Sequence, residues 1–393
     1  MMLIKSFSTI LFITVSVVAV FSQPKELQDS GKDTLQAYSF YQEAGRLAKI
    51  RQLDSSRYYM NMAANEYEAA GEWDRYFDVV YQVSYLYSQE YNYEVSLSYL
   101  DSIWNKFSTY FNPEYKSAID YYGSYALVNM NLFNYIESLN YFKNLEDILV
   151  QNPHATPENH LFTYYYHGVI YYRLGQYDEA LKLMLRCLDF GVKNKNTSYE
   201  GSVYNLLGII YRRLGEYDRA LNFYEKTLAL DSPHKTEVQL TPVYNNLGRV
   251  HNYLGNYQTA LNYFNLGLSA LEDYSTDYYT VESRLVNNKA ILLIEQGSYT
   301  EATIILTHVL EREKSKFGGL GKNSIETLQQ LGMLKFKSKN YSDAEHYYHQ
   351  TLSMMEESLG ANNSLLSDIY VRLGQNYLAL KQFNDALDAF QYA

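Results

Sequence analysis

Cysteine and proline are both scarce in this chain of 393 residues, which contains one cysteine and six prolines. The single thiol, Cys187, excludes an internal disulfide framework, so packing must hold the fold together. No Walker-type loop, HExxH, GxSxG or set of paired zinc-ligand cysteines occurs in the sequence. We therefore assign no catalytic residue, no metal ligand and no cofactor, and we expect a protein that is not an enzyme.

Basic residues are also in deficit, with 33 Lys and Arg against 44 Asp and Glu and a formal net charge of −11. Binding to the phosphates of nucleic acids depends on clustered Lys and Arg, so nucleic acid is not an expected partner. Tyrosine, by contrast, is abundant, at 44 residues. This excess suits an array of helices that pack through aromatic side chains at every crossing.

A long apolar run is missing too, apart from a short one near the N-terminus. Lys5 precedes the apolar stretch Ile10–Phe21, and small residues near Ser22 allow cleavage before Gln23. A run of about 12 residues is short for a membrane span, which needs about 20. Residues 1–22 are therefore predicted to be a signal peptide, with a retained N-terminal anchor as the alternative. We expect an exported protein, periplasmic or at the cell surface or secreted, with no membrane-spanning segment after the signal.

The clearest motif lies between Tyr204 and Pro233. It places Tyr204, Leu207, Gly208 and Tyr211 in one helix, Gly215 in a turn, and Tyr217, Ala220 and Tyr224 in a second helix. Small residues stand where two antiparallel helices approach closely, and Gly215 can adopt the positive φ that ends a helix. Asp218 favours the start of the second helix through its charge. This order resembles the tetratricopeptide repeat, with Tyr204 where the family most often has Trp.

The same pattern recurs along the chain at intervals of 40 or 42 residues. The first small position is filled at Gly168, Gly208, Gly248, Ala290, Gly332 and Gly374. The second is filled at Ala180, Ala220, Ala260, Ala302, Ala344 and Ala386, and the turn aromatic at Tyr177, Tyr217, Tyr257, Tyr299, Tyr341 and Phe383. Counting backwards puts Ala126 and Ser138, then Ser84 and Ser96, in the two small columns, and a weaker pair begins near Ala44. The longer period resembles the variety of repeat seen in kinesin light chains and in many bacterial repeat proteins.

The resemblance implies an all-α fold, a right-handed α-α superhelix of about nine tetratricopeptide-like helical hairpins. We divide the chain into the signal peptide at 1–22, divergent helical repeats at 23–118, and a repeat array at 119–393 whose last repeat is truncated. Phe383, Leu387 and Phe390 are expected on an uncovered face of the last helix. This favours a chain cut from a longer protein, with cover by a partner as the alternative.

The resemblance also implies a concave groove lined by outward residues of the first helix of each hairpin. Asn205, Asn245 and Asn287 form a ladder at one such position, as do the asparagines that kinesin light chains use to hold peptides. Arginines collect on the same wall, and a guanidinium fork fits a carboxylate. The candidate groove residues are Tyr165, Tyr172, Arg173, Asn205, Arg212, Arg213, Asn245, Arg249, Asn252 and Asn287. The alternative for each of them is an exposed side chain that is solvated or paired with a neighbouring acid.

Other side chains favour structural roles. His346 and His349 have a spacing that can hold a metal, but no third ligand follows at a matching interval, so a surface or packing role is expected. Cys187 occupies an interior position of a second helix, and we expect a buried, inert thiol.

The predicted function is a non-catalytic scaffold whose groove binds a protein or peptide segment, with an acidic or C-terminal segment as the class that the arginines fit. The alternative is a sensory or regulatory arm of a larger protein. Its effector, such as a caspase-like CHAT domain, a histidine kinase or a DNA-binding domain, would lie beyond residue 393. A third and weaker possibility is an assembly role in outer-surface or gliding machinery.

Overall fold

The chain folds into consecutive helical hairpins. The computed structural model describes residues 34–393 except 231–236, 272–278, 322–323 and 360–365. This described chain divides between Leu214 and Gly215 into two compact units. Both contain helices joined by turns, and no strand occurs among the described residues. The signal peptide predicted at 1–22 and the repeat-closing Pro233 lie outside them.

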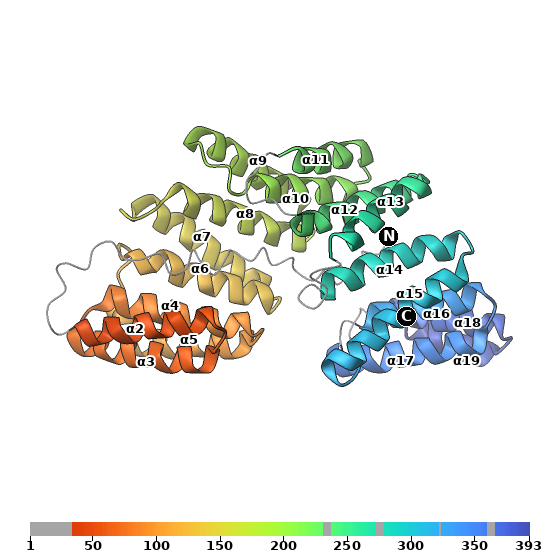
Figure 1. The fold of residues 1–393 in the computed structure, drawn as a ribbon, viewed down its shortest axis with the longest axis horizontal. Coiled ribbons are helices and arrows are strands. Elements are labelled where there is room, and N and C mark those ends of the chain that lie inside the picture. Colours follow the sequence, from red (N-terminus) through yellow and green to blue (C-terminus); the bar gives the residue numbers. More distant parts are fainter. Residues whose placement is uncertain (1–33, 231–236, 272–278, 322–323, 360–365) are drawn as a thin grey trace. The chain divides into compact units, whose positions relative to one another are not determined.

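Residues 34–214 hold the first four hairpins and α10, the first helix of the fifth. The elements are α2 (Leu35–Lys49), α3 (Leu53–Ala70), α4 (Trp73–Gln89), α5 (Tyr93–Phe107), the 3-10 helix η2 (Ser108–Tyr110), α6 (Lys116–Asn131), α7 (Tyr135–Gln151), α8 (Pro157–Arg173), α9 (Tyr177–Asn194) and α10 (Glu200–Arg213). Even-numbered helices are the first helices of their hairpins. The helices α2, α4, α6 and α8 each pack on their hairpin partner, as α8 does on α9, and consecutive hairpins of this unit contact each other (Figure 1).

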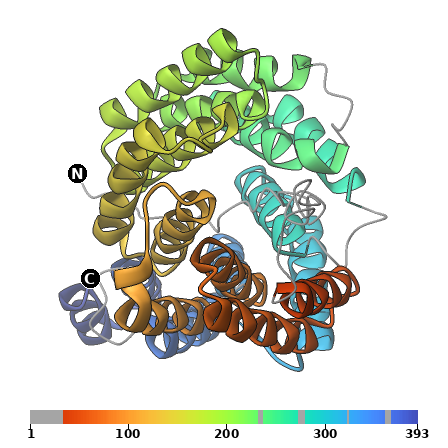
Figure 2. The same cartoon turned by 90° about the vertical axis from the view of Figure 1, so that its left-hand side faces the viewer.

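Residues 215–393 continue the alternation. The elements are α11 (Tyr217–Ala229), α12 (Glu237–Tyr253), α13 (Tyr257–Ser269), α14 (Tyr279–Glu295), α15 (Tyr299–Phe317), α16 (Ser324–Lys337), α17 (Tyr341–Leu359), α18 (Ser367–Ala379) and α19 (Phe383–Gln391). Here first helices also contact each other directly, α12 with α14 and α14 with α16. Figure 2 shows α12 and α13 as neighbouring antiparallel helices, in agreement with Figure 1.

The turn inside each hairpin contains one residue with positive φ. Four turns use glycine, with φ between 74° and 80°, namely Gly175, Gly215, Gly255 and Gly297. Five use another residue, with φ between 59° and 64°, namely Arg51, Tyr91, Phe133, Lys339 and Lys381. The predicted role of Gly215 is confirmed. The positive φ of the turn is thus kept in every hairpin, even where another residue replaces the glycine that favours it.

The small first-helix residues stand where the second helix of the same hairpin comes closest. A Cβ added to Gly168 would lie 2.4 Å from the Met184 side chain, and one added to Gly248 would lie 2.5 Å from the Phe264 ring. Ala180 and Ala260, the second small residues of the same two hairpins, are fully buried. Size at these positions is therefore set by contact between the two helices, as the repeat pattern predicted.

In the divergent hairpins, serine replaces alanine at the second small position and adds a hydrogen bond. The Ser56 hydroxyl donates to the carbonyl of Ala44 at 2.8 Å, and the Ser138 hydroxyl donates to that of Ala126 at 2.5 Å. Ser96 donates to the carbonyl of Ser84 at 2.9 Å, and their hydroxyl oxygens are 2.8 Å apart. The column assignments of these weak repeats are confirmed by these contacts.

The all-α tetratricopeptide architecture is confirmed for the described residues, in which nine helical pairs follow one another. The division at residue 118 is a division of sequence pattern and stays a prediction. Phe383, Leu387 and Phe390 of α19 are exposed, as expected. No helix in the described ranges is both long and apolar enough to cross a bilayer.

Candidate functional site

Three successive first helices in residues 215–393 bring polar side chains into register. Asn245 on α12, Asn287 on α14 and Gln329 on α16 are each separated by 42 residues, one period of the array. Because α12 contacts α14 and α14 contacts α16, this column runs across adjacent helices. We call Asn245, Arg249, Arg284, Asn287 and Glu326 the amide–arginine surface.

The amides of this surface join neighbouring repeats. Asn288 donates through Nδ2 to Oδ1 of Asn245 at 2.7 Å, and Asn287 donates through Nδ2 to Oγ1 of Thr327 at 3.2 Å. Both ladder residues are buried, with Asn287 only 1% exposed. The Oδ1 atom of Asn287 nevertheless has no hydrogen-bond partner among the described residues. Both asparagines therefore serve the packing of first helices, and the unpaired Oδ1 of Asn287 is itself buried.

Charged side chains accompany the amides. Glu326 at the start of α16 is exposed to solvent, yet loss of hydration raises the pKa of its carboxyl. The positive charges of Arg284 and Arg249 oppose that shift. The charges of Arg249 on α12 and Arg284 on α14 therefore act on the carboxylate of Glu326 on α16.

The remaining predicted residue of this unit, Asn252, is half-buried on α12. Its Oδ1 has no hydrogen-bond partner within the described residues. It lies two turns beyond Asn245, so it extends the polar face toward the C-terminal end of the helix.

Six predicted groove residues belong to residues 34–214. Tyr165, Tyr172, Arg173, Asn205 and Arg213 are half-buried, and Arg212 is buried. Burial raises the pKa of the Tyr165 hydroxyl, whose ring lies 5.4 Å from that of Tyr199. These residues lie in the other unit from Asn245, Arg249, Asn252 and Asn287, so the two groups are described separately.

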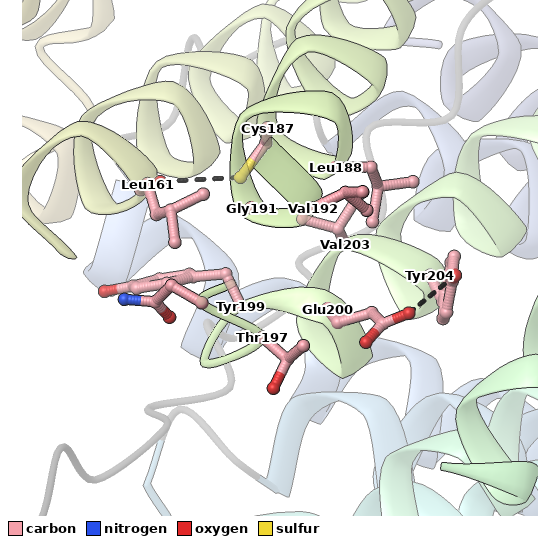
Figure 3. Close-up of a pocket in the computed structure, with 11 residues that line it drawn as sticks. Leu161, Cys187, Leu188, Gly191, Val192, Thr197, Tyr199, Glu200, Val203 and Tyr204 are labelled. Carbon is pink, nitrogen blue, oxygen red and sulfur yellow. Dashed lines mark hydrogen bonds between the residues drawn. The ribbon is translucent and has the colours of Figure 1, made fainter. Parts of the chain in front are cut away.

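A small cavity lies among α8, α9 and α10 (Figure 3). Its volume is about 50 Å³, enough for a few water molecules but not for a peptide backbone. Its walls are mainly apolar, and the Tyr204 hydroxyl donates to Glu200 at 2.8 Å on one side. Cys187 lies against it with its thiol 3.6 Å from the carbonyl of Leu161 (Figure 3). Burial raises the pKa of this thiol to about 12. The prediction of a buried cysteine is confirmed, and its inertness stays a prediction.

Sequence reasoning missed one surface, on the first helices of residues 34–214. Asp78 on α4 and Asp120 on α6 are separated by 42 residues, and Tyr41 and Tyr81 by 40. The signal was available, because these positions fall in register when the repeat is counted backwards. These hairpins depart most from the repeat pattern, so the sequence marks their polar columns weakly.

The comparisons with known proteins agree with this architecture. One tetratricopeptide repeat model matches residues 159–232, 281–357 and 323–393, and a second matches residues 241–271. Together these matches cover more than half of the chain. The chain therefore belongs to the tetratricopeptide repeat family.

Three solved structures of similar length share the fold. The apo form of the quorum sensor NprR from B. thuringiensis has a TM-score of 0.65 and 16% identity, covering 91% of this chain and 96% of that chain. The apo form of RapI has a TM-score of 0.59 and 12% identity, with the same coverage. A Rap protein complexed with competence and sporulation factor has a TM-score of 0.57 and 13% identity, again over 91% and 96%. A comparison with curated protein sequences found no match.

Proposed function

We propose that this protein is a non-catalytic scaffold that binds a protein or peptide segment on the amide–arginine surface. The observation that carries the proposal is the presence of two arginines, Arg249 and Arg284, on adjacent first helices, close enough to Glu326 for their charges to act on its carboxyl. Guanidinium forks pair with carboxylates. A segment that carries an acidic side chain or a free C-terminus fits these groups.

Family membership and fold support the proposal in a general way. Tetratricopeptide arrays present a continuous surface made by stacked hairpins, and such surfaces suit extended partners. One Rap protein of the same fold is described in complex with competence and sporulation factor. We extend to this chain only the idea that the array holds a partner.

The test begins with selection of random dodecapeptides, displayed on phage, against the full chain. Enriched peptides are then measured by fluorescence anisotropy against the wild type and Arg249→Ala/Arg284→Ala. Loss of two charge-assisted contacts should weaken binding at least about tenfold. We avoid Asn245 because it accepts a bond from Asn288, and its loss would disturb packing.

The matched control is Arg219→Ala in the same unit. Arg219 lies on the second helix α11 and pairs with Glu216 at 2.8 Å at an exposed site. Its replacement should leave peptide affinity within about twofold, because exposed pairs contribute little. Equal affinities for the double variant and the wild type would remove the amide–arginine surface as the site.

We also propose export. N-terminal sequencing of the protein from fractionated cells should give a chain that begins at Gln23, whereas a chain that retains its first residues in the membrane fraction would favour the anchor. The groove residues predicted in 34–214 and the effector beyond residue 393 stay predictions.

A further inference from the structure

Residues 34–214 carry a second polar surface of different chemistry. Tyr41 lies on α2, Asp78 and Tyr81 on α4, and Asp120 on α6, all on first helices. The helices α4 and α6 are in direct contact. Tyr41 and Asp78 also touch, because the tyrosine hydroxyl hydrogen-bonds the carboxylate. We call these four residues the tyrosine–carboxylate surface.

The Asp78 carboxyl is only partly compensated. Burial raises its pKa to about 6, and the hydrogen bonds from Tyr41 and Gln82 and the charge of Lys116 oppose this shift. The charge of Asp74 adds to it. A carboxylate with two donors and a nearby lysine still binds its proton more tightly than an exposed one does.

Asp120 is compensated less well. Burial raises the pKa of its carboxyl to about 7, the charges of Asp78 and Asp74 raise it further, and Lys116 alone opposes them. No hydrogen bond reaches this carboxylate within the described residues. The side chain is half-buried and thus still accessible. Among the residues that the structure describes, Asp120 therefore lacks a donor, and Lys116 is the one positive charge that acts on it.

A buried hydroxyl beside the carboxylates is also unpaired. Ser117 is 2% exposed, and its Oγ has no hydrogen-bond partner among the described residues. Its backbone N–H donates to Oδ1 of Asp74 at 2.9 Å. Ser117 precedes Asp120 by three residues, so both lie on the same side of α6. This turn of α6 thus holds two polar groups without hydrogen-bond partners among the described residues, the Ser117 hydroxyl and the Asp120 carboxylate. The carboxylate of Asp74 lies next to them.

Aromatic rings flank the carboxylates. Burial raises the pKa of the Tyr41 and Tyr81 hydroxyls, so both side chains stay neutral at any physiological pH. The Tyr81 ring lies 6.2 Å from that of Tyr85 on the same helix. The faces of such rings attract cations, and Arg and Lys stems pack well against them.

We propose that the tyrosine–carboxylate surface binds a lysine or arginine side chain of a partner polypeptide. The cation donates to Asp120, pairs with Asp78 and lies against the tyrosine rings. A basic segment is the partner class because two half-buried carboxylates, Asp78 and Asp120, are opposed, within the described chain, by the positive charge of Lys116 alone. No group of three or more His, Cys, Asp or Glu within the described ranges is arranged to hold a metal ion. This surface lies in the other unit from the amide–arginine surface, so the two proposals stand independently.

The test uses a fluorescein-labelled octapeptide of alternating lysine and glycine, titrated into the full chain at low ionic strength. The variant Asp78→Asn/Asp120→Asn keeps the shape of both side chains and removes their mutual repulsion, so it should fold. We expect its affinity to fall at least about tenfold. The control Asp189→Asn removes one exposed acid of α9 in the same unit, which pairs with Lys193 at 2.7 Å. The control should change affinity by less than about twofold.

Three further binding measurements with the same peptide complete the test. Wild-type affinity should rise as pH increases from 5 to 8, because the two carboxyls must lose their protons, and the double variant should lose that rise. Arg249→Ala/Arg284→Ala should bind the lysine peptide as the wild type does. Calcium or magnesium ions at millimolar concentration should not displace the peptide beyond their effect on ionic strength. The proposal is overturned if Asp189→Asn loses as much peptide affinity as Asp78→Asn/Asp120→Asn does. It is also overturned if the wild-type affinity does not depend on pH, or if a divalent cation displaces the peptide specifically.

Discussion

The close contact between Gly248 and Phe264 predicts a measurable cost for a single methyl group. In Gly248→Ala the new Cβ would lie 2.5, 2.7 and 2.9 Å from three atoms of the Phe264 ring. Ordinary contacts between carbon atoms are 3.5–4.0 Å, so the ring must shift by about 1 Å. Phe264 is 1% exposed and packs among Leu271, Leu285 and Leu292, so it has no free space to enter.

Two opposing terms set the size of the effect. Overpacking of a full core costs about 1–3 kcal/mol. Alanine gains about 1 kcal/mol over glycine inside a helix. Because the ring is fully enclosed, we expect the upper part of the first range and a net destabilisation of about 1–2 kcal/mol.

The last hairpin supplies the matched control. A Cβ at Gly374 would lie 2.6 Å from the Phe390 ring, nearly the same clash, but Phe390 is 39% exposed. Its ring can swing toward solvent, so Gly374→Ala should be neutral or stabilising by up to about 1 kcal/mol.

Native-state hydrogen exchange is the suitable assay, because repeat arrays open locally. Amides of α12 and α13 should exchange about 5–30 times faster in Gly248→Ala, while those of α18 and α19 should not exchange faster in Gly374→Ala. Equal effects in both variants would refute the reasoning, because enclosure of the ring is its only point of difference.

Three further predictions concern other hairpins. Phe133→Gly should stabilise its turn by about 0.5–1 kcal/mol in urea unfolding, since Phe133 is exposed at φ 64°, and Gly175→Ala at φ 74° should do the reverse. Ser96→Ala should lower the free energy of unfolding by about 1–3 kcal/mol, because the buried Ser84 hydroxyl loses a hydrogen-bond partner. The double variant Ser84→Ala/Ser96→Ala should recover most of that loss, and additive losses in the double variant would contradict the prediction. Cys187 should resist iodoacetamide at pH 8 until local unfolding. Its raised thiol pKa should make stability fall as pH rises above the unfolded value of about 9, and Cys187→Ser should remove the part of that fall that precedes the titration of tyrosines above about pH 10.

The packing columns could be predicted from the sequence because their chemistry is forced. Gly168 and Gly248 are small because Met184 and Phe264 occupy the space beside them, so the residue type reports the contact. The turn was predictable in the same way at Gly215, but not at Phe133, where the backbone adopts a positive φ without the residue that favours it. A pattern read from residue types fails where tertiary packing maintains a geometry against local preference.

The candidate surfaces were harder to predict for a physical reason. Register places Asn245 and Asn287 on first helices, but only the structure shows that Asn288 and Thr327 already occupy their hydrogen-bonding groups. Whether an amide at such a position meets a ligand or a neighbour depends on how closely adjacent first helices approach. That spacing is a property of the hairpin stack and is not encoded at any single position.

The two candidate surfaces differ in charge because the repeat has separate positions for packing and for contact with a partner. The packing columns restrict residue size in every repeat, whereas the intervening columns of the first helices are free to change charge. At one such column the chain carries Asp78 and Asp120 in one unit and Arg284 and Glu326 in the other, all in register. Substituting these residues should therefore alter partner preference at little cost in stability. Substituting the glycine and alanine columns should do the opposite.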